Sequence, residues 1–176
     1  IASFRQALSI KPDYAEAYSN LGHAFQAQGQ LEESVACCRQ AILLKPDLAV
    51  AYSNLGNALQ DQRKLDDAVA CFRQAILLKP DFAEAHYNLG NALKEQCHLE
   101  AAIACYREAF RIKPDYAAAL SNQGIVFMAQ SRLDEAVALF RQALSVKPDH
   151  VDAHSNLIFV LDLKKDVDTL TLQAER

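Results

Sequence analysis

Apolar residues recur at intervals of three and four along the chain and form a repeating series of short amphipathic segments. One pair of segments covers residues 49–62 (AVAYSNLGNALQDQ) and residues 65–78 (LDDAVACFRQAILL). This spacing places the apolar side chains on one side of a helix, which has about 3.6 residues per turn. The pattern therefore predicts two amphipathic α-helices joined by a short turn.

The tripeptide Lys-Pro-Asp divides the chain into units of 34 residues. Proline cannot donate a backbone hydrogen bond and disfavours helix at the residue before it, so it ends the second helix of each unit. The aspartate that follows is predicted to cap the next helix. If the turn inside each unit needs a left-handed residue, the non-glycine residues there cost about 1 kcal/mol each. The prolines are Pro12, Pro46, Pro80, Pro114 and Pro148, and the turn residues are Gly29, Arg63, Cys97 and Ser131.

The residues of each unit resemble the tetratricopeptide repeat. That family carries a large residue, Leu-Gly and a second large residue on the first helix, then a small residue, an aromatic residue, an alanine and a proline. The resemblance implies an all-α fold, a right-handed superhelical solenoid of antiparallel helix pairs in which each repeat packs against its neighbours. In the unit that begins at Ala49 the signature residues are Tyr52, Leu55, Gly56, Leu59, Ala68, Phe72, Ala75 and Pro80.

The solenoid is expected to cover residues 1–163. Two bulky residues, Ile158 and Leu170, then replace the glycine of the repeat and its small partner, which prevents a close helix crossing. Residues 164–176 are therefore predicted to form a short capping or bridging helix that begins near Asp168 or Thr169. The expected divisions of the solenoid are a half repeat (1–12), full repeats (about 13–46, 47–80, 81–114 and 115–148) and the first helix of a further repeat (149–163).

A glycine recurs on the first helix of each full repeat, and a small residue follows it twelve positions later. This pairing predicts that the two helix backbones approach closely beside the glycine. The pairs are Gly22 with Ser34, Gly56 with Ala68, Gly90 with Ala102 and Gly124 with Ala136.

The side of the first helix opposite its packed face carries polar residues, and we call it the asparagine stripe. In the family that the repeats resemble, first helices line the concave surface, so the stripe is expected to face a groove. One asparagine recurs in all five first helices, with further polar residues beside it in the first three. The recurring residues are Asn20, Asn54, Asn88, Asn122 and Asn156, and their polar neighbours are His23, Asn57, Asn91, Asp61 and Glu95.

Two interpretations of the recurring asparagine are open. Each amide can satisfy local backbone groups or a neighbouring repeat, which is a structural role. Alternatively, an amide offers a donor and an acceptor as a peptide group does, so a row of amides can hold the backbone of an extended ligand whatever its side chains. The second interpretation predicts a protein-protein interaction scaffold that binds extended segments of partner or substrate proteins.

Three phrases, AYSNLGNALQ, KPDFAEAHYNLGNALKE and DAHSNLIFVLDL, are similar to the repeat region of protein O-linked N-acetylglucosamine transferases, particularly bacterial-type members. That resemblance implies a concave asparagine ladder that holds substrates for a C-terminal glycosyltransferase region. The alternative is a stand-alone adaptor of the co-chaperone kind with no attached enzyme. A clamp for acidic tails needs Lys or Arg on the stripe, and the nearest cation, Lys94, lies on its flank.

The asparagine stripe becomes apolar toward the C-terminus, where Ile125 and Phe159 replace polar residues. These two residues are predicted to form the apolar end of the groove. Either further C-terminal sequence covers this end, or it receives the hydrophobic anchor of a partner.

Composition fits a soluble repeat protein, because 51% of the 176 residues are hydrophobic and 23% are charged. The net charge of −4 argues against nucleic acid or an anionic membrane as a partner. No apolar run approaches the roughly 20 residues of a transmembrane helix, so a cytoplasmic location is expected. The chain opens inside an amphipathic pattern without an initiator methionine, and we expect a piece of a longer protein. Self-association is not predicted either way.

No catalytic, cofactor or metal site is predicted, and this chain is expected to be a non-catalytic region. Three of the five cysteines follow the repeat period and none forms a Cys-x-x-Cys pair, so we expect reduced, semi-buried thiols rather than disulfides or metal ligands. The histidines share no recurring arrangement with carboxylates or cysteines. His86 and His154 occupy the large packed position of the first helix and are expected in or near the core.

Overall fold

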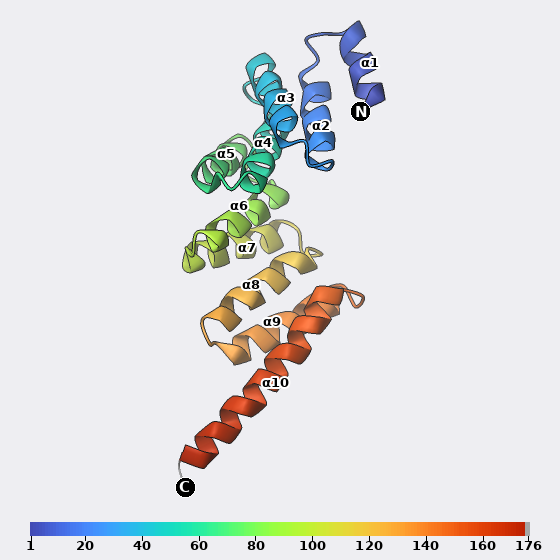
Figure 1. The fold of residues 1–176 in the computed structure, drawn as a ribbon. Coiled ribbons are helices and arrows are strands. Elements are labelled where there is room, and N and C mark those ends of the chain that lie inside the picture. The colour runs from blue at the N-terminus through green and yellow to red at the C-terminus, as the bar shows by residue number, and fades with distance from the viewer. Residues whose placement is uncertain (175–176) are drawn as a thin grey trace. The chain divides into compact units, whose positions relative to one another are not determined.

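In this computed structural model the chain is all-α, and the structure describes residues 1–174, with side chains up to residue 165. The described residues contain ten helices and no strand. Figure 1 shows each helix connected to the next by a short turn. The helices are α1 (Ala2–Ile10), α2 (Ala15–Gln26), α3 (Leu31–Leu44), α4 (Ala49–Asp61), α5 (Leu65–Leu78), α6 (Ala83–Glu95), α7 (Leu99–Ile112), α8 (Ala117–Ala129), α9 (Leu133–Val146) and α10 (Val151–Ala174).

The helices pack as adjacent pairs, which confirms the fold class predicted from the repeats. The pairs α2/α3, α4/α5 and α8/α9 have the most extensive contacts, and consecutive first helices also touch, as in α2/α4 and α8/α10. The chain divides into two compact units, residues 1–98 and residues 99–176. Unit 1 holds α1 to α6, and unit 2 holds α7 to α10.

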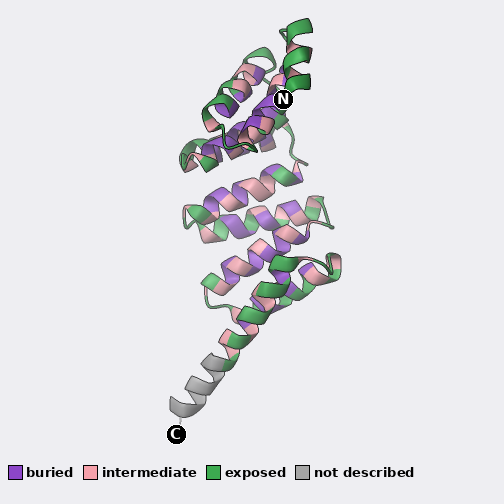
Figure 2. Ribbon diagram, turned by 45° about the vertical axis from the view of Figure 1, so that its right-hand side comes forward, coloured by how far each residue is buried: buried purple, intermediate pink, exposed green. Residues whose placement is uncertain are grey.

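Each unit buries side chains between neighbouring helices, as expected for a repeat protein. In unit 1, Phe72 and Ala75 of α5 have a relative exposure of 0%. In unit 2, Phe140 and Ala143 of α9 are equally buried, and Ala153 of α10 joins the core formed with α8. In Figure 2 most helices accordingly carry buried residues on one side and exposed residues on another.

The turn between paired helices has a left-handed residue at its tip. The φ angles are 73° at Gly29, 63° at Arg63, 61° at Cys97 and 59° at Ser131. In the same turn the Lys64 N–H donates to the Leu59 carbonyl at 2.9 Å, the bond that defines a Schellman motif. The left-handed requirement considered from the sequence is therefore confirmed, and three repeats meet it without glycine.

The Lys-Pro-Asp turn between repeats has the same backbone bond each time it occurs. The N–H of Leu48 donates to the Lys45 carbonyl, and that of Phe82 to the Lys79 carbonyl, both at 3.1 Å. The N-cap positions are Leu48 and Phe82, and neither helix has a side-chain cap. The prediction that aspartate caps the next helix is therefore wrong, because the aspartate lies one residue earlier, inside the turn.

The recurring glycines let the two helices of a pair approach closely, as predicted: a Cβ on Gly22 would lie 3.1 Å from the Ser34 backbone oxygen. A Cβ on Gly56 would lie 2.6 Å from Cε1 of Phe72, and one on Gly124 would lie 2.7 Å from Cε1 of Phe140. In these two repeats the space beside the glycine is thus filled by the phenylalanine ring sixteen positions later in the chain. The small residue twelve positions later, such as Ala68, is itself buried at 0% exposure.

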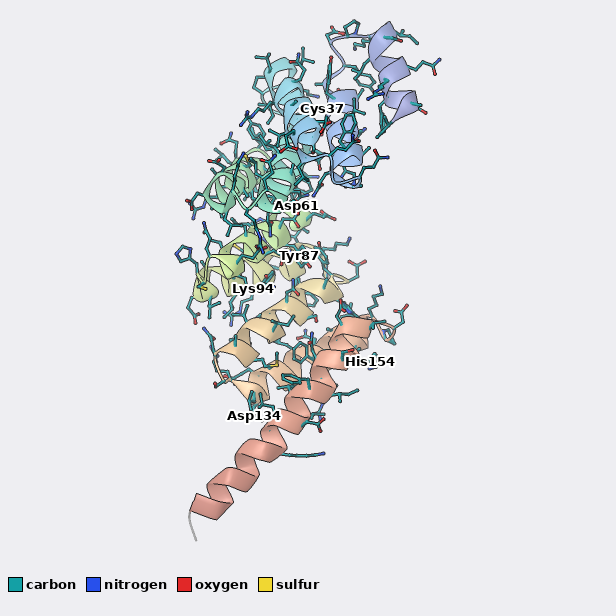
Figure 3. The ribbon with its side chains drawn as sticks, viewed as in Figure 1. Cys37, Asp61, Tyr87, Lys94, Asp134 and His154 are labelled. Carbon is teal, nitrogen blue, oxygen red and sulfur yellow. The ribbon has the colours of Figure 1, made fainter. Side chains whose placement is uncertain are left out.

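The last helix, α10, runs without a break over 24 residues. One helix stands where the sequence predicts two, which corrects the boundary placed near residue 163. Residues 151–174 contain neither glycine nor proline, so nothing interrupts the helical hydrogen bonds. Lys164 of α10 also forms an ion pair with Asp134 of α9, labelled in Figure 3. The packing of Leu170 lies outside the described side chains.

Candidate functional site

The asparagine stripe lies on the outer face of the first helices in both units. On α4 of unit 1, for example, Leu55 and Leu59 are buried on the opposite face at 7% and 3% exposure. The predicted stripe residues divide into two groups. Asn20, His23, Asp61, Glu95 and Phe159 are exposed, whereas Asn54, Asn57, Asn88, Asn91, Asn122, Ile125 and Asn156 are half-buried.

Asn54 joins two consecutive first helices. Its Nδ2 donates to the Ser19 carbonyl at 3.2 Å and lies 3.0 Å from the Ser19 hydroxyl oxygen, so α4 is bonded to α2. A backbone carbonyl can only accept, so the amide nitrogen must face Ser19. Within residues 1–174, Oδ1 of Asn54 makes no hydrogen bond in the structure, and it points away from Ser19 because the amide is planar. Asn54 therefore has a structural role and also keeps a free acceptor.

The other asparagines of the row do not all share this arrangement. Asn20 and Asn88 form no hydrogen bond with any described residue, so both sides of their amides are available. Ser121 stands one repeat and one residue before Asn156, as Ser19 does before Asn54, yet the Ser121 hydroxyl is buried without a hydrogen-bond partner in the described part of the chain. The structural role is thus specific to particular repeats.

Sequence reasoning missed Ser19, although the signal was present. A serine directly precedes four of the five recurring asparagines, at Ser19, Ser53, Ser121 and Ser155. Because first helices of consecutive repeats are neighbours, a partner 35 residues away lies on the adjacent helix. The recurring Ser-Asn pair could therefore have indicated a bond between repeats.

The carboxylates of the stripe in unit 1 also bond between repeats. Asp61 accepts from the Gln26 amide at 2.8 Å, and Glu95 accepts from Arg63 at 2.6 Å. Figure 3 labels Asp61 on α4 and Lys94 on α6. Lys94 is half-buried beside the stripe, so the structure shows no cluster of cations on the described stripe of unit 1.

The histidines and cysteines do not form a reactive centre. The ring nitrogens Nε2 of His86 and His154 lie 3.0 Å and 2.8 Å from the carbonyls of Pro80 and Pro148. His86 is half-buried, but His154 is exposed, which corrects its expected place near the core. Among the described residues no three His, Cys, Asp or Glu side chains are placed to hold a metal ion.

The cysteines are free thiols, and burial makes two of them poor nucleophiles. Desolvation raises the pKa of Cys38 to about 12 and that of Cys71 to about 11. Cys38 is fully buried, and a Cβ added at Gly22 would lie only 2.6 Å from its sulfur atom. These thiols fill space between helices.

Family comparisons agree with the helix pairs and their turns. Models described as tetratricopeptide repeat match residues 15–48, 83–116 and 117–150, and a model described as TPR repeat matches residues 61–96. The chain belongs to the tetratricopeptide repeat family. No curated protein sequence matches it.

Solved structures with similar tetratricopeptide folds support this assignment. MamA is 25% identical with a TM-score of 0.74, and the match covers 84% of this chain and 86% of that chain. PilF of Pseudomonas aeruginosa is 22% identical with a TM-score of 0.81, covering 86% and 69%. A chain of the APC/C hetero-tetramer Cut9-Hcn1 is 19% identical with a TM-score of 0.84, covering 92% and 32%.

The tetratricopeptide fold is typical of scaffolds for protein-protein interaction, and the chain is a repeat region without a recognisable catalytic part. Across the described residues, no helix combines the length and the apolar character that crossing a membrane requires. The asparagine stripe is therefore the candidate site on this scaffold.

Proposed function

We propose that the asparagine stripe binds extended segments of partner or substrate proteins by hydrogen bonding to their backbone. The observation that carries the proposal is Asn54, whose amide nitrogen is held by Ser19 while Oδ1 is left as an acceptor. A side chain fixed by the scaffold loses little conformational freedom when a ligand arrives, which favours binding. Asn20 and Asn88 add amides with no hydrogen-bond partner in residues 1–174.

The spacing of the row suits a regular backbone. Consecutive first helices of unit 1 are in contact, and packed helices lie about 8–10 Å apart. An extended ligand in polyproline-II conformation rises about 3.1 Å per residue with three residues per turn, or about 9 Å per turn. Each asparagine therefore meets the same face of the ligand at every third residue.

The charges of unit 1 favour a neutral or basic segment over an acidic one. Asp61 is bonded to a neutral amide and keeps its negative charge, whereas Glu95 is paired with Arg63. An acidic tail would need cations to receive its carboxylates, and Lys94 stands beside the row rather than in it. The proposal therefore excludes the co-chaperone type of carboxylate clamp.

The wider role we propose is recruitment of substrates for a glycosyltransferase region of the same protein. The similarity of three phrases to the repeat region of O-linked N-acetylglucosamine transferases supports it. The alternative is an adaptor without an attached enzyme, which is favoured by the match to 86% of the MamA chain. Sequencing the parent gene beyond the codon for Arg176 separates them, because only the first predicts a glycosyltransferase region there.

Binding can be tested with peptides selected from a phage-displayed random library on the whole chain. Affinity is then measured by fluorescence polarisation for the wild type and for the double variant Asn20→Ala, Asn88→Ala. Two lost hydrogen bonds should weaken binding by about ten-fold or more, with an unchanged unfolding midpoint because neither amide has a partner in the described fold.

The matched control removes two amides from the second helices, with Gln40→Ala and Gln74→Ala, and should leave affinity unchanged. Methylating the peptide backbone nitrogens should weaken binding to the wild type, because a methylated nitrogen cannot donate to Oδ1. Equal affinity of the asparagine double variant and the wild type would show that the row does not hold the ligand.

A further inference from the structure

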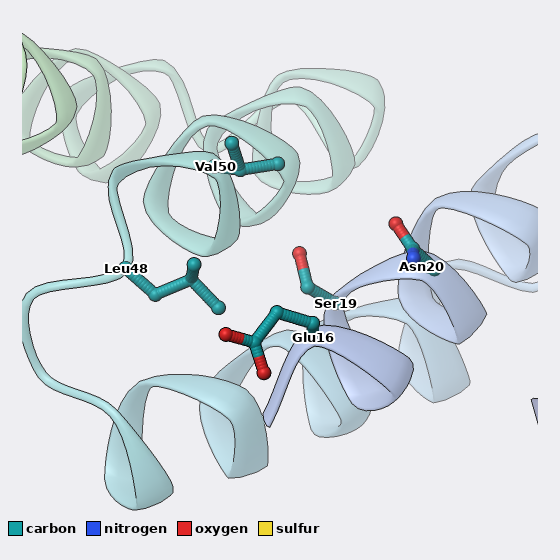
Figure 4. A pocket seen from close by; sticks show the side chains of 5 residues that line it. All are labelled: Glu16, Ser19, Asn20, Leu48 and Val50. Carbon is teal, nitrogen blue, oxygen red and sulfur yellow. The ribbon is translucent and has the colours of Figure 1, made fainter. Parts of the chain in front are cut away.

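A pocket opens in unit 1 between the start of α2 and the start of α4, beside the first asparagine of the row (Figure 4). Its volume is about 180 Å³, and it is lined by Glu16, Ser19, Asn20, Leu48 and Val50. In Figure 4 the Leu48 and Val50 side chains lie on the α4 side and the other three on α2. The pocket therefore touches both Asn20 and the serine that holds Asn54.

In this repeat a leucine replaces the aromatic residue that follows Lys-Pro-Asp in other repeats. Where that residue is aromatic, the lysine ammonium lies over its ring, at 5.4 Å for Lys11 over Tyr14 and 5.1 Å for Lys79 over Phe82. Leu48 has the same backbone position but no ring. Its side chain lines the pocket at the start of α4.

The lysine of this repeat pairs with a carboxylate. Lys45 forms an ion pair with Glu16 of α2 at 2.8 Å, at the edge of the pocket, whereas the residue at the equivalent place for Lys79 is Val50. The hydrogen bond from Lys45 lowers the pKa of Glu16, so the carboxylate stays charged and paired. The single ionisable residue among those lining the pocket is thus already neutralised.

Val50 departs from the repeat pattern in the same direction. The equivalent residues in the neighbouring repeats are the acidic Glu16 and Glu84, and Val50 replaces them with an apolar side chain that is 41% exposed. Leu48 and Val50 therefore both differ from the residues usual at their positions in the repeat. Together they give the pocket an apolar wall.

We propose that this pocket receives an uncharged apolar side chain, of leucine to phenylalanine size, from the extended partner segment. An apolar cavity of roughly 150 Å³ is enough to bind benzene, so the observed volume suits such a side chain. A charged side chain gains little, because Lys45 and Glu16 already satisfy each other. The proposal rests on the asparagine row for the course of the ligand backbone and adds the residue that selects among ligands.

Blocked amino acids test the pocket without an extended backbone. The probes are N-acetyl-leucine, N-acetyl-phenylalanine, N-acetyl-alanine and N-acetyl-lysine N-methylamides, and the readout is the NMR shift of the Leu48 and Val50 methyl groups in the whole chain. The leucine and phenylalanine probes should bind at least about ten-fold more tightly than the alanine and lysine probes. Tighter binding of the lysine probe would overturn the proposal in favour of recognition by Glu16.

Two variants use residues that the chain itself carries at equivalent positions. Leu48→Phe introduces the residue found at Phe82 and fills the pocket, and Val50→Glu introduces the residue found at Glu16 and Glu84 and charges its wall. Each should weaken the leucine and phenylalanine probes by at least about ten-fold. Because Leu48→Phe removes the original leucine methyl signals, the Val50 methyls report on that variant and the Leu48 methyls on Val50→Glu.

The control is Leu43→Phe, at a leucine of α3 that is 74% exposed and outside the pocket lining. It should bind the probes as the wild type does. If Leu48→Phe, Val50→Glu and the wild type bound the leucine and phenylalanine probes equally well, the proposal that this pocket receives an apolar side chain would be wrong. The two proposals fail separately, because Asn88→Ala should weaken selected peptides and leave the blocked amino acids unaffected.

Discussion

Units 1 and 2 are built from the same repeat, yet the α2/α4 contact of unit 1 and the α8/α10 contact of unit 2 differ in their hydrogen bonds. In unit 1 the Asn54 amide donates to Ser19, and the hydroxyl of that serine is also within hydrogen-bond distance. In unit 2 the corresponding Ser121 hydroxyl is buried with no partner among the described residues, although Asn156 occupies the matching position. The shared asparagine therefore does not guarantee a shared bond.

The two units also differ in their other polar and apolar side chains. Unit 1 carries carboxylates that bond to the preceding repeat, such as Asp61 with Gln26. Unit 2 places Gln123 in the core at 5% exposure and leaves Ile158 and Phe159 of α10 63% and 58% exposed. In unit 2, therefore, two apolar side chains are exposed while a polar side chain is buried. The 34-residue period therefore determines how the helix backbones pack. Whether a polar side chain finds a hydrogen-bond partner depends on the residues of each individual repeat.

The backbone packing common to both units is tested by removing the ring beside the glycine. Phe72→Ala in unit 1 and Phe140→Ala in unit 2 should each lower the free energy of unfolding by about 3–5 kcal/mol, because both rings are fully buried. Chemical denaturation of the whole chain measures the loss, and hydrogen exchange assigns it to a unit. Leu77→Ala, at a leucine that is 73% exposed, is the control and should cost under about 0.5 kcal/mol. A much smaller loss for Phe140→Ala would mean that the units do not share one packing.

The polar core residue of unit 2 should be its weakest point. Gln123 stands at the repeat position of Leu55 and is 5% exposed, so it places an amide where the other full repeats bury an apolar side chain. Gln123→Leu should therefore raise the free energy of unfolding by about 1–3 kcal/mol, and Leu55→Gln should lower it by at least as much. Thermal and denaturant unfolding followed by circular dichroism measure both. A destabilising Gln123→Leu would show that the amide has a structural partner.

The bond between first helices separates the units most directly. Asn54→Ala should destabilise the fold by about 1 kcal/mol because Ser19 loses its partner, whereas Asn156→Ala should change stability by less than about 0.5 kcal/mol. Ser19→Ala and Ser121→Ala form the matching pair, and only Ser19→Ala is expected to cost stability. Denaturation midpoints of the four variants supply the measurement. Equal losses from both asparagines would remove the distinction between the units.

The smallest difference is expected at the left-handed turns. Ser131→Gly should stabilise unit 2 by about 1 kcal/mol, because glycine adopts a positive φ without strain. Arg63→Gly relieves the same strain in unit 1 but loses the ion pair with Glu95, which is partly exposed and worth about 0–1 kcal/mol. Its gain should therefore be smaller. If loss of the ion pair explains the smaller gain in stability of Arg63→Gly, high salt should bring that gain closer to the gain of Ser131→Gly. Unfolding midpoints of both variants with and without salt test this.

Much of the fold could be predicted because it depends on backbone rules. The period of the prolines, the helix pairs and the left-handed turn at Arg63 follow from where helices must stop. The break near residue 163 was inferred from bulky residues at Ile158 and Leu170, but those affect packing between helices and not continuity within one. With no glycine or proline present, α10 continues.

The site was less predictable because it depends on contacts between repeats. That Asn54 lies on the stripe follows from helical spacing, but its bond to Ser19 depends on how two helices are placed side by side. The pocket at Leu48 likewise depends on how the starts of α2 and α4 are placed side by side. Such features become visible in a sequence only when each repeat is compared with its neighbours position by position.

The direction in which the Asn54 amide faces bears on which amino acids a partner could place opposite it. In the binding mode proposed above, the nitrogen of Asn54 is already bonded to Ser19, so the ligand residue opposite it would have to donate a backbone hydrogen. Proline has no backbone N–H and could not do so. The proposal therefore predicts that a partner can vary most of its side chains but cannot place proline at that position.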